Sequence, residues 1–430
     1  MKDKILAAID NAREEIIEIG DYVLENPEMG YKEYKTAELV KNVFEKLGIN
    51  YRDNLALTGV KGELCGNGEG PNICIIGEMD AVKCFGHPYA DSDTGAAHAC
   101  GHNAQIASML GAAIGIVKSG IMEKLGGKVT FFAVPAEEFV ELEYRNKLRE
   151  EGKISFLGGK QEFVKLGVMD DVDVMVMQHT DAFGDAQIQA NAGGPANGFV
   201  GKLVNYIGKE AHAGGAPHMG INALNAAELG MMAIHANRET FRDEDHIRVH
   251  PIITKGGDLV NIVPSDVRIE TYVRGARTEA ILDASMKVNR SLEAGAYAVG
   301  AQCKITELPG YLPVLPYPPL AKLMCNNLGE IMGHDRVEQV AGSSGGSTDA
   351  GDISHLMPTV HAYIGGAKGG AHCPDYEIED KEMAYITSAK ALIMTAIDLL
   401  AEGAETGLEI KAGFKPALTK ETYLRDWGHL

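Results

Sequence analysis

Apolar residues recur at spacings of three and four near the start of the chain and predict amphipathic helices. The pattern covers residues 4–25 and residues 34–48. The second run ends on Gly48, a residue type that readily closes a helix C-terminus. We therefore expect two helices ahead of the first strand.

Further along the chain, continuous apolar runs that end in polar or glycine-rich residues predict buried strands. Strands that are apolar throughout suit a sheet covered on both faces. Four such runs occupy residues 72–81, 128–138, 171–180 and 358–366. In open α/β sheets, ligands collect beyond the carboxyl ends of the strands. Three of these ends carry ionisable residues, which are therefore candidates for a site: Asp80, Glu137 with Glu138, and His179.

The middle of the chain shows a different order of elements. Strands are predicted at residues 199–209, 247–257, 266–275 and 302–308, and helices at residues 222–239 and 278–300. This βαββαβ order predicts a ferredoxin-like module. The proline-rich residues 309–319 then lead back to the first domain. We expect one α/β domain made of residues 1–197 and 309–430, with residues 198–308 inserted in it.

Length and composition agree with a globular protein of two domains. The chain has 430 residues, of which 45% are hydrophobic and 23% charged, and single cores stop growing below this length. A formal charge of −20 argues against binding to nucleic acid, which needs clustered lysine and arginine. The seven cysteines are an odd number and suit reduced thiols.

We expect a cytoplasmic protein. The N-terminus is charged throughout and lacks the apolar core of a secretory signal. No apolar run in the sequence reaches the length that we expect of a membrane-spanning segment.

The first candidate for chemistry is the stretch "HACGH", which holds His98, Cys100 and His102. A helix predicted from about Ala104 would point its unpaired N–H groups at this stretch and favour a thiolate at Cys100. A thiolate can bind a metal or act as a nucleophile. Alternatively, Cys100 is a small buried residue and the histidines form local hydrogen bonds. The spacing alone does not decide between these readings.

Three more segments supply compatible side chains. The adjacent carboxylates of Glu137 and Glu138 allow one to bind a metal while the other takes a proton from water. His179 ends a predicted strand, and His372 follows a glycine-rich loop. Each histidine is ambiguous alone. Together with Cys100, these residues offer thiolate, imidazole and carboxylate ligands.

Several motifs occur in an order that resembles one known family: "GEMDAV", "HACGHN", "VPAEE", "GKEAHAGGAPHMGINALNAA", "NIVPSDVRIETYVRG" and "GGSTDAGDISHLMPTV". The chain resembles the M20 family of metal-dependent amidohydrolases and peptidases. It is most similar to the branch of aminoacylases, auxin-conjugate hydrolases and aminobenzoyl-glutamate hydrolases. The resemblance implies an α/β fold in which a mixed-sheet, zinc-peptidase-like catalytic domain carries the inserted module as a lid and dimerisation domain.

The resemblance also implies roles for individual residues. The metal ligands would be Cys100, His102, Glu138, His179 and His372. They would hold two divalent ions, with Cys100 between them, and zinc, manganese, cobalt or nickel would all suit this set. Glu137 would be the general base and the later proton donor to the leaving amine.

In the inserted module, the resemblance assigns three more residues. His212 would stabilise the oxyanion, often across a dimer interface, so a homodimer formed through the module is expected. Asn261 and Arg274 would engage the carboxylate of the substrate. The role of His218 stays open, as do the contacts of residues 139–163, a charged segment predicted to be helical.

Two departures from the family pattern bear on the activity. Asn103 stands where many aminoacylase-like relatives have aspartate, and Glu78 stands where aminopeptidase-like members have a metal-binding histidine. The second departure weakens an aminopeptidase assignment.

The expected activity is metal-dependent hydrolysis of a small-molecule amide, an N-acyl or N-aminoacyl amino acid or a short dipeptide-like substrate. The alternatives are a dipeptidase or carboxypeptidase of the same fold, and a noncatalytic binding or scaffold protein. A mechanism with Cys100 as nucleophile is disfavoured, because a thiolate held by a cation attacks poorly.

Overall fold

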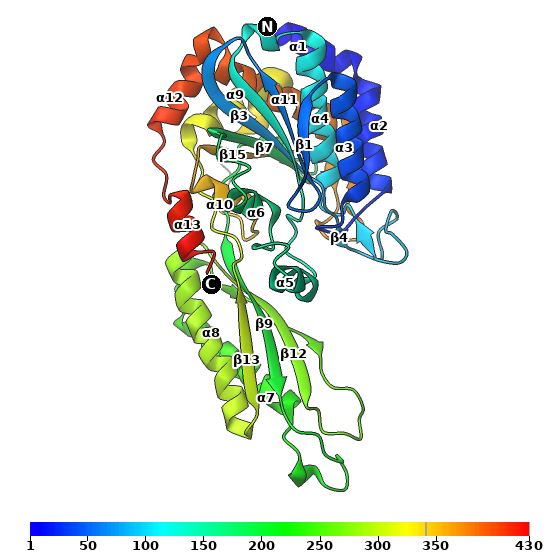
Figure 1. The fold of residues 1–430 in the computed structure, drawn as a ribbon, viewed down its shortest axis with the longest axis vertical. Coiled ribbons are helices and arrows are strands. Elements are labelled where there is room, and N and C mark those ends of the chain that lie inside the picture. Colours follow the sequence, from blue (N-terminus) through cyan, green and yellow to red (C-terminus); the bar gives the residue numbers. More distant parts are fainter. Residues whose placement is uncertain (340–341, 430) are drawn as a thin grey trace.

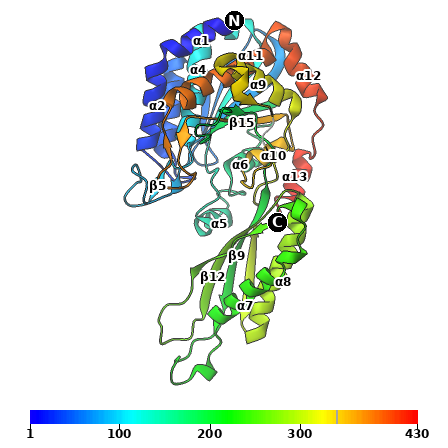
Figure 2. The same cartoon turned by 180° about the vertical axis from the view of Figure 1, so that it is seen from behind.

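The computed structural model describes residues 1–339 and 342–429. Figure 1 shows a larger α/β unit and, below it, an elongated unit made of the middle of the chain; Figure 2 shows the same two units from behind. The larger unit is built on an eight-stranded sheet with strand order β1-β2-β6-β3-β7-β15-β8-β14. Its strands are β1 (Asn50–Leu55), β2 (Gly59–Cys65), β3 (Gly68–Glu78), β6 (Gly126–Val134), β7 (Val174–Thr180), β8 (Ala190–Asn191), β14 (Val337–Glu338) and β15 (Thr359–Ile364).

The four central strands of this sheet, β6, β3, β7 and β15, run parallel, while β1, β2 and β8 pair antiparallel to their inner neighbours. The sheet is therefore mixed, as expected. Parallel strands end at the same edge, so the residues that follow β3, β6 and β7 are brought together there. This is why segments far apart in the sequence share one site.

The sheet is buried on both faces, which explains the continuous apolar runs. On β3, Ile73 and Ile75 belong to one apolar cluster, while Cys74 and Ile76 belong to another. The alternation follows from successive side chains pointing to opposite faces of a strand. The helices that contribute to the first cluster are α1 (Lys2–Asn11), α2 (Arg13–Glu25), α3 (Tyr34–Leu47), α4 (His102–Ser119), α9 (Pro318–Met332), α11 (Ser388–Leu400) and α12 (Glu405–Gly413). The helices of the larger unit that contribute to the second are α5 (Leu142–Glu150), α6 (Gly159–Lys165), α10 (Ala350–Ser354) and α13 (Lys420–Asp426).

The prediction of one helix over residues 4–25 is wrong, because the segment forms α1 and α2. The break falls at Ala12, which has φ −100° and ψ 8°. Ile5, Ile9, Ile16 and Ile19 are buried on both sides of the break, so the apolar spacing continues across it and hides it. The second predicted helix is α3, and Gly48 closes it in the left-handed conformation at φ 68°. The charged segment 139–163, predicted to be helical, contains α5 and the start of α6, with a non-helical stretch between them.

The elongated unit contains β9 (Gly198–Ile207), α7 (Ala223–Ala236), β10 (Arg248–Val249), β11 (Ile252–Lys255), β12 (Asp266–Gly275), α8 (Thr278–Val299) and β13 (Gln302–Leu308). The strand order is β10-β12-β9-β13, and β11 also pairs with β12. Apolar residues of α7 and α8 pack on one face of this sheet, and the other face carries polar residues such as Arg268 and Glu270. The βαββαβ order matches the sequence pattern. The strand expected at residues 247–257 is interrupted, because Val249 and Ile252 pair with β12 in separate stretches.

Aromatic side chains join the two units. Phe139 follows the glutamate pair of the larger unit, and its ring lies 4.9 Å from Phe199 and 5.9 Å from Tyr272 of the elongated unit. Tyr311 completes the cluster at 5.3 Å from Phe139. The hydroxyl of Tyr272 also donates a hydrogen bond to the carbonyl of Phe139. The elongated unit is thus anchored directly beside Glu138.

One helix corrects the expectation that no apolar run is long enough to cross a membrane. By length and composition alone, the continuous helix Glu382–Leu400 is long and apolar enough to cross a membrane, with a mean hydropathy of 1.4. However, 83% of its apolar window is buried inside the protein. A core helix passes the same test, and the position of this helix in the first apolar cluster accounts for its composition.

Shorter elements border the site. The hairpin β4 (Val82–Lys83) and β5 (Ala96–Ala97) precedes the "HACGH" stretch, and the hairpin β16 (Ala367–Lys368) and β17 (Glu377–Ile378) encloses the loop that carries His372.

Candidate metal centre and active site

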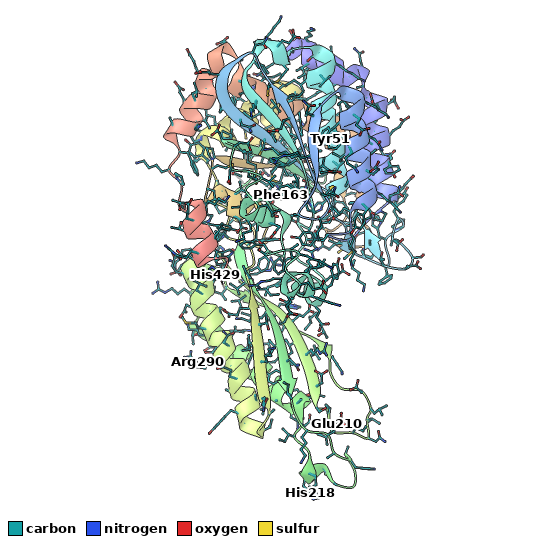
Figure 3. The ribbon with its side chains drawn as sticks, viewed as in Figure 1. Tyr51, Phe163, Glu210, His218, Arg290 and His429 are labelled. Carbon is teal, nitrogen blue, oxygen red and sulfur yellow. The ribbon has the colours of Figure 1, made fainter. Side chains whose placement is uncertain are left out.

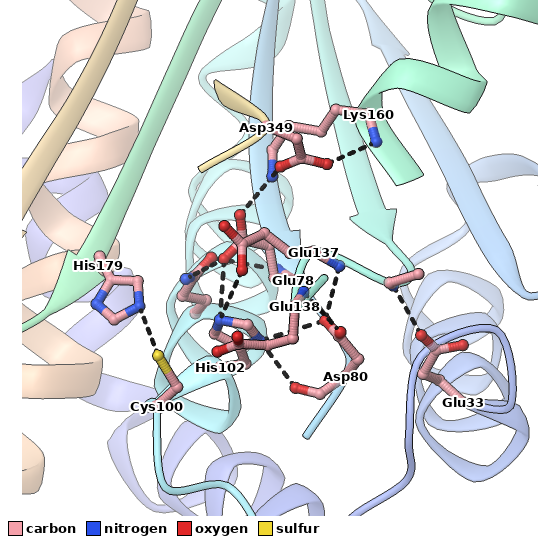
Figure 4. Close-up of polar contacts among 12 residues, drawn as sticks. Glu33, Glu78, Asp80, Cys100, His102, Glu137, Glu138, Lys160, His179 and Asp349 are labelled. Atoms are coloured by element: carbon pink, nitrogen blue, oxygen red, sulfur yellow. Dashed lines mark hydrogen bonds and ion pairs between the residues drawn. The ribbon is translucent and has the colours of Figure 1, made fainter. Parts of the chain in front are cut away.

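Four separate segments bring their functional side chains together beside the carboxyl edge of the large sheet. Figure 4 labels residues of three of them: Cys100 and His102, Glu137 and Glu138, and His179. Cys100 lies in the turn before α4, and His102 is the first residue of that helix, two positions earlier than predicted. Glu137 and Glu138 follow β6, and His179 lies near the end of β7. The backbone N–H of His372 donates to the carbonyl of Ala99 at 2.7 Å, which fastens its loop to the cysteine segment.

The distances between the candidate ligand atoms are compatible with a shared ion. Cys100 Sγ lies 3.5 Å from His179 Nε2, and His372 Nε2 lies 3.0 Å from Glu138 Oε1. Two ligands at about 2.0–2.3 Å from one cation are separated by about 3–3.6 Å. The five residues predicted as ligands fall into two groups that share Cys100, one with His102 and His179 and the other with Glu138 and His372. The chain thus offers two adjoining candidate sites with a thiolate in common.

His102 and His179 both present Nε2 to this centre. His102 Nδ1 lies 2.8 Å from the carbonyl of Asp80, and His179 Nδ1 lies 2.8 Å from that of Thr180. A proton on each Nδ1 leaves Nε2 free to bind a metal, and such backbone partners are usual behind metal-binding histidines. His102 Nε2 is buried and has no hydrogen-bond partner among the described residues. A metal ion would satisfy it, so the residues present fit the implied metal.

Asp80 belongs to none of the candidate ligand groups, but it positions the residues that do. Its two carboxylate oxygens accept the backbone N–H groups of Glu137 at 3.1 Å and Glu138 at 3.0 Å. Its Oδ1 also lies 3.3 Å from His102 Nδ1. One buried carboxylate therefore fixes both glutamates and one imidazole. Its place at the end of a predicted strand made it a candidate in the sequence, but not for this role.

The turn that presents the glutamates is held in an uncommon backbone conformation. Ala136 has φ 56°, which is left-handed. Its N–H donates to Glu33 Oε1 at 2.8 Å, and its carbonyl accepts from the buried Arg145 at 3.3 Å. These partners keep the bend between β6 and Glu137 in place.

Burial and charge give the two glutamates different protonation behaviour. Burial, with the charges of Glu78 and Glu138 beside it, raises the pKa of Glu137 well above its ordinary value. Burial also acts to raise the pKa of Glu138, but the hydrogen bond and charge of His372 outweigh it and lower the pKa. Glu138 is thus the ionised ligand-like carboxylate, and Glu137 is the one able to carry a proton.

Cys100 is held as a thiolate. Burial and the charge of Glu138 raise the pKa of its thiol, but the neighbouring imidazoles of His179 and His102 lower it to about 6. The thiolate is the form that binds metals. The sequence predicted this form from the helix N-terminus, and the structure adds the imidazoles as the direct cause.

A buried ion-pair network lies against the centre and was missed from the sequence. Lys160, on α6, pairs with Glu78 and lies 2.5 Å from Asp349 Oδ1. Glu78 Oε2 in turn lies 3.2 Å from His102 Nε2. All of these side chains are 1% exposed or less. The charged segment around Lys160 gave a helix signal, and nothing in its spacing pointed to Glu78 or Asp349.

The residues predicted in the elongated unit are not brought together with the centre in the same way. Arg274 is half-buried, and its guanidinium donates to Ser347 Oγ at 2.7 Å, which places it at the junction of the two units. His212 and Asn261 are exposed, and they belong to two adjoining segments, since Ala213 N donates to the carbonyl of Asn261 at 2.9 Å. Figure 3 shows Glu210 and His218, which bracket His212 in the chain, at the end of the elongated unit far from the larger one. His212 therefore does not approach the metal centre of its own chain.

Comparison with known proteins matches the chain to one family and to several relatives. The model of the family described as "Peptidase family M20/M25/M40" matches residues 74–396. The "Xaa-Arg dipeptidase" of Mus musculus is 26% identical over 97% of this chain and 90% of its own length. The "IAA-amino acid hydrolase ILR1-like 4" of Arabidopsis thaliana is 24% identical over 86% of this chain and 83% of its own.

A solved structure shares the fold. The YXEP protein of Bacillus subtilis, described as "a Dinuclear Metal Binding Peptidase from M20 Family", superposes with a TM-score of 0.66 at 22% identity, covering 91% of this chain and 99% of that one.

Proposed function

The chain belongs to peptidase family M20/M25/M40 and is a hydrolase of amide or peptide bonds; from this premise we propose that it cleaves N-acyl or N-aminoacyl amino acids with the help of two divalent metal ions. The observation that carries the proposal is the pair of adjoining ligand groups that share Cys100. Their thiolate, imidazole and carboxylate atoms suit zinc, manganese, cobalt or nickel. When bound, such ions activate water and polarise the amide carbonyl.

The other steps fall to side chains of this chain. Glu137 lies beside the ligands, with Oε2 3.9 Å from His102 Nε2, and its raised pKa lets it accept a proton and hold it. It is the general base that takes the proton of the attacking water and the general acid that passes it to the leaving amine. Asp80 keeps Glu137 and Glu138 in register through their N–H groups.

Substrate binding is assigned to the elongated unit, which acts as a lid. Arg274 would bind the carboxylate of the substrate bidentately, a geometry in which arginine forms its strongest ion pairs. Asn261 and His212 lie far from the centre of their own chain, so they act only from a second subunit. We propose a homodimer formed through residues 198–308, in which His212 of each subunit supplies an oxyanion donor to the partner subunit. All seven cysteines are free, and we propose a cytoplasmic location.

A dipeptidase is the second candidate, favoured by the relative named for cleaving Xaa-Arg dipeptides. Both candidates use the same centre and differ in whether the acyl group carries a free amine. A noncatalytic scaffold is disfavoured because the ligand set and Glu137 are complete.

The test compares Glu137→Gln with wild type on a panel of N-acyl amino acids and dipeptides. The variant should lose hydrolysis while its metal content, measured by mass spectrometry, stays at the wild-type level. The matched control is Glu239→Gln, an exposed glutamate of the elongated unit, which should behave as wild type. No turnover of any amide by metal-loaded wild type would favour the scaffold, and unimpaired turnover by Glu137→Gln would remove the general-base role.

A further inference from the structure

A cavity lies beside the junction of the two units, away from the metal centre. It has a volume of about 450 Å³, within the range of about 300–1,000 Å³ that is usual for small-molecule sites. Two stretches of chain form its wall: residues 149–165, which run from α5 to α6, and residues 424–429 at the end of α13. Figure 1 shows α13 beside the end of α8 nearest the larger unit, and Figure 3 labels His429 there. None of the proposed metal ligands lines this cavity.

The wall of the cavity is cationic. Four basic residues line it, and no aspartate or glutamate of the described residues does: Arg149, Lys165, Arg425 and His429. The chain has 60 acidic and 40 basic residues, so a wall without carboxylates runs against its composition. Glu162 is buried and does not line the cavity, and its Oε2 accepts the backbone N–H groups of Ser155 and Phe156, both at 2.8 Å. The cavity therefore favours an anion.

Arg149 carries a charge that nothing in the described part of the chain compensates. Its side chain is half-buried in the last turn of α5 and has no hydrogen-bond or ion-pair partner among the described residues. Burial lowers the pKa of Arg149, and no carboxylate of those residues acts to raise it. Basic residues are common in the last turn of a helix, where they face the negative end of the helix dipole. Removing a charge from water without a partner nevertheless costs free energy, and an anion in the cavity would offset that cost.

The other cations of the wall differ in how far they are neutralised. Arg425 forms a bidentate pair with the exposed Asp426, at 2.6 and 2.7 Å, so part of its charge is used within α13. Lys165, in the last turn of α6, is exposed and forms no ion pair within the described ranges. The cavity also has an apolar wall, made of Ile154, Phe156 and Leu424. A ligand with one anionic and one apolar end matches this lining.

The helix on one side of the cavity also holds the linker between the two units. Residues 309–317 lead from β13 back to the larger unit, and Trp427 Nε1 donates to the carbonyl of Gly310 in this linker at 2.8 Å. The carbonyl of Tyr311 accepts from Phe199 N at 2.8 Å, and the hydroxyl of Tyr311 donates to the carbonyl of Glu137. The position of α13 is therefore linked, through the linker, to the backbone of the proposed general base.

We propose that this cavity is a second binding site, which takes a small organic phosphate. Arg149 binds the phosphate group through its planar fork, and Lys165 adds a point charge. The organic part of the ligand lies against the apolar wall. Because residues of α13 form the opposite side, the bound ligand ties this helix to the connection between α5 and α6 and holds Trp427 on the linker. The site goes beyond the proposed amide hydrolysis and uses none of the residues assigned to it.

The experiment follows binding through Trp427, the single tryptophan of the chain. Phenyl phosphate and inorganic phosphate are titrated into the protein as purified, and again after treatment with a chelator, because phosphate also binds metal ions. Wild type should show a saturable change of tryptophan fluorescence in both forms and should bind phenyl phosphate more tightly. Phenol, which lacks the phosphate group, should not bind. Deuterium exchange of residues 309–317 and 418–429 should slow when phenyl phosphate is bound.

Two variants identify the cations that hold the phosphate. Arg149→Gln should weaken binding about 10- to 100-fold, the range of one hydrogen-bonded charge, and should abolish the slower exchange. Lys165→Gln should weaken binding by a smaller factor, and its exposed position makes it the decisive variant if Arg149→Gln does not fold. Arg290→Gln changes an exposed arginine of α8, labelled in Figure 3, and should bind phenyl phosphate as wild type does.

Three results would overturn this inference. The first is wild type that binds neither phosphate, by fluorescence and by calorimetry. The second is binding of wild-type strength in both Arg149→Gln and Lys165→Gln. The third is a fluorescence change that chloride reproduces at the same ionic strength, since this would reflect screening of surface charge. Binding without slower exchange of residues 309–317 would overturn the link between the site and the linker. All of these measurements are made without an amide substrate, so their failure leaves the proposed hydrolysis untouched.

Discussion

Lys160 Nζ lies 2.5 Å from Asp349 Oδ1, and both side chains are fully buried against the metal centre. Lys160 also donates its backbone N–H to Asp349 Oδ2 at 2.9 Å and pairs with Glu78. One ammonium group thus joins α6, the end of β3 and the loop before α10. Because Ser347 of that loop accepts a hydrogen bond from Arg274, the network links Arg274 of the elongated unit to Glu78, which lies 3.2 Å from His102 Nε2.

Replacing Lys160 should destabilise the protein strongly. In Lys160→Met, Glu78 and Asp349 keep their burial and lose their cation, and breaking a buried pair costs about 3–5 kcal/mol in free energy of unfolding. Urea denaturation measures the loss. The exposed Lys153 pairs with Glu151 at 2.8 Å, and Lys153→Met should leave the stability nearly unchanged. Adding Asp349→Asn to Lys160→Met should recover part of the loss; a single variant as stable as wild type would show that the network is not a structural requirement.

Asp80→Asn should impair catalysis with little loss of fold. Asparagine has one acceptor oxygen and an NH₂ group, which cannot accept from both Glu137 N and Glu138 N. Losing a partner behind a metal ligand typically costs 10- to 100-fold in metal affinity or activity, so kcat/KM should fall by about that factor. Thermal unfolding monitors the fold in parallel. Wild-type kinetics in Asp80→Asn would mean that the turn held at Ala136 positions the glutamates without it.

Removal of the metal should lower both activity and stability. Ions bound to the folded state stabilise it, by about 2.7 kcal/mol when free metal is at 100 times its Kd. Treatment with a chelator should therefore abolish hydrolysis and lower the unfolding temperature. Re-addition of zinc, manganese, cobalt and nickel in turn identifies the ion that restores activity best. The variant Cys100→Ser, which changes the shared ligand, should respond little to the chelator, and a wild type indifferent to it would contradict the two-ion site.

Mixed dimers should test whether His212 acts across subunits. His212→Ala and Glu137→Ala should each be inactive alone. After the two are unfolded together and refolded, half of the dimers carry one intact site that combines Glu137 of one subunit with His212 of the partner subunit, so roughly a quarter of wild-type activity should return. Restoration absent from dimers of verified mixed composition would show that His212 does not act on the site of the partner subunit.

Glu33 should make stability fall as the pH rises. Its buried carboxyl accepts from Tyr31 N at 2.9 Å, Ala136 N at 2.8 Å and Thr58 Oγ1 at 2.6 Å. Burial and the charge of Asp80 still raise its pKa to about 7, against 4.5 when unperturbed. The folded protein therefore binds this proton more tightly than the unfolded protein does. The free energy of unfolding that results is largest below pH 4.5, and this contribution is lost as the pH rises past 7.

The variant Glu33→Gln isolates this effect, because glutamine resembles the protonated carboxyl. It should match wild type near pH 4.5 and exceed it by about 2–3 kcal/mol at pH 8. Free energies of unfolding from urea curves at both pH values give the difference. A difference that does not vary with pH would mean that Glu33 titrates as an exposed glutamate does.

Much of the fold followed from local pattern. Strands β12 and β13 match the predicted residues 266–275 and 302–308, because alternation of apolar and polar side chains is a property of the strand itself. The sequence pattern does not reveal the break at Ala12, because the spacing of the buried apolar residues continues across it. Glu137, Glu138 and His179 became candidates because they stand at strand ends, which parallel strands gather at one edge, whereas the roles of metal ligand and general base came from the resemblance to the family.

The sequence by itself determined the element order, the carboxyl-edge location of Glu137, Glu138 and His179, and the residue types able to hold metal. Only the tertiary structure decided which groups meet. The pairing of Lys160 with Glu78 and Asp349, the hydrogen bond from Trp427 to the carbonyl of Gly310, and the separation of His212 from its own centre all depend on contacts between distant segments. Local periodicity fixes the face on which a side chain lies, whereas its partner is fixed by strand register and by the packing of one unit on another.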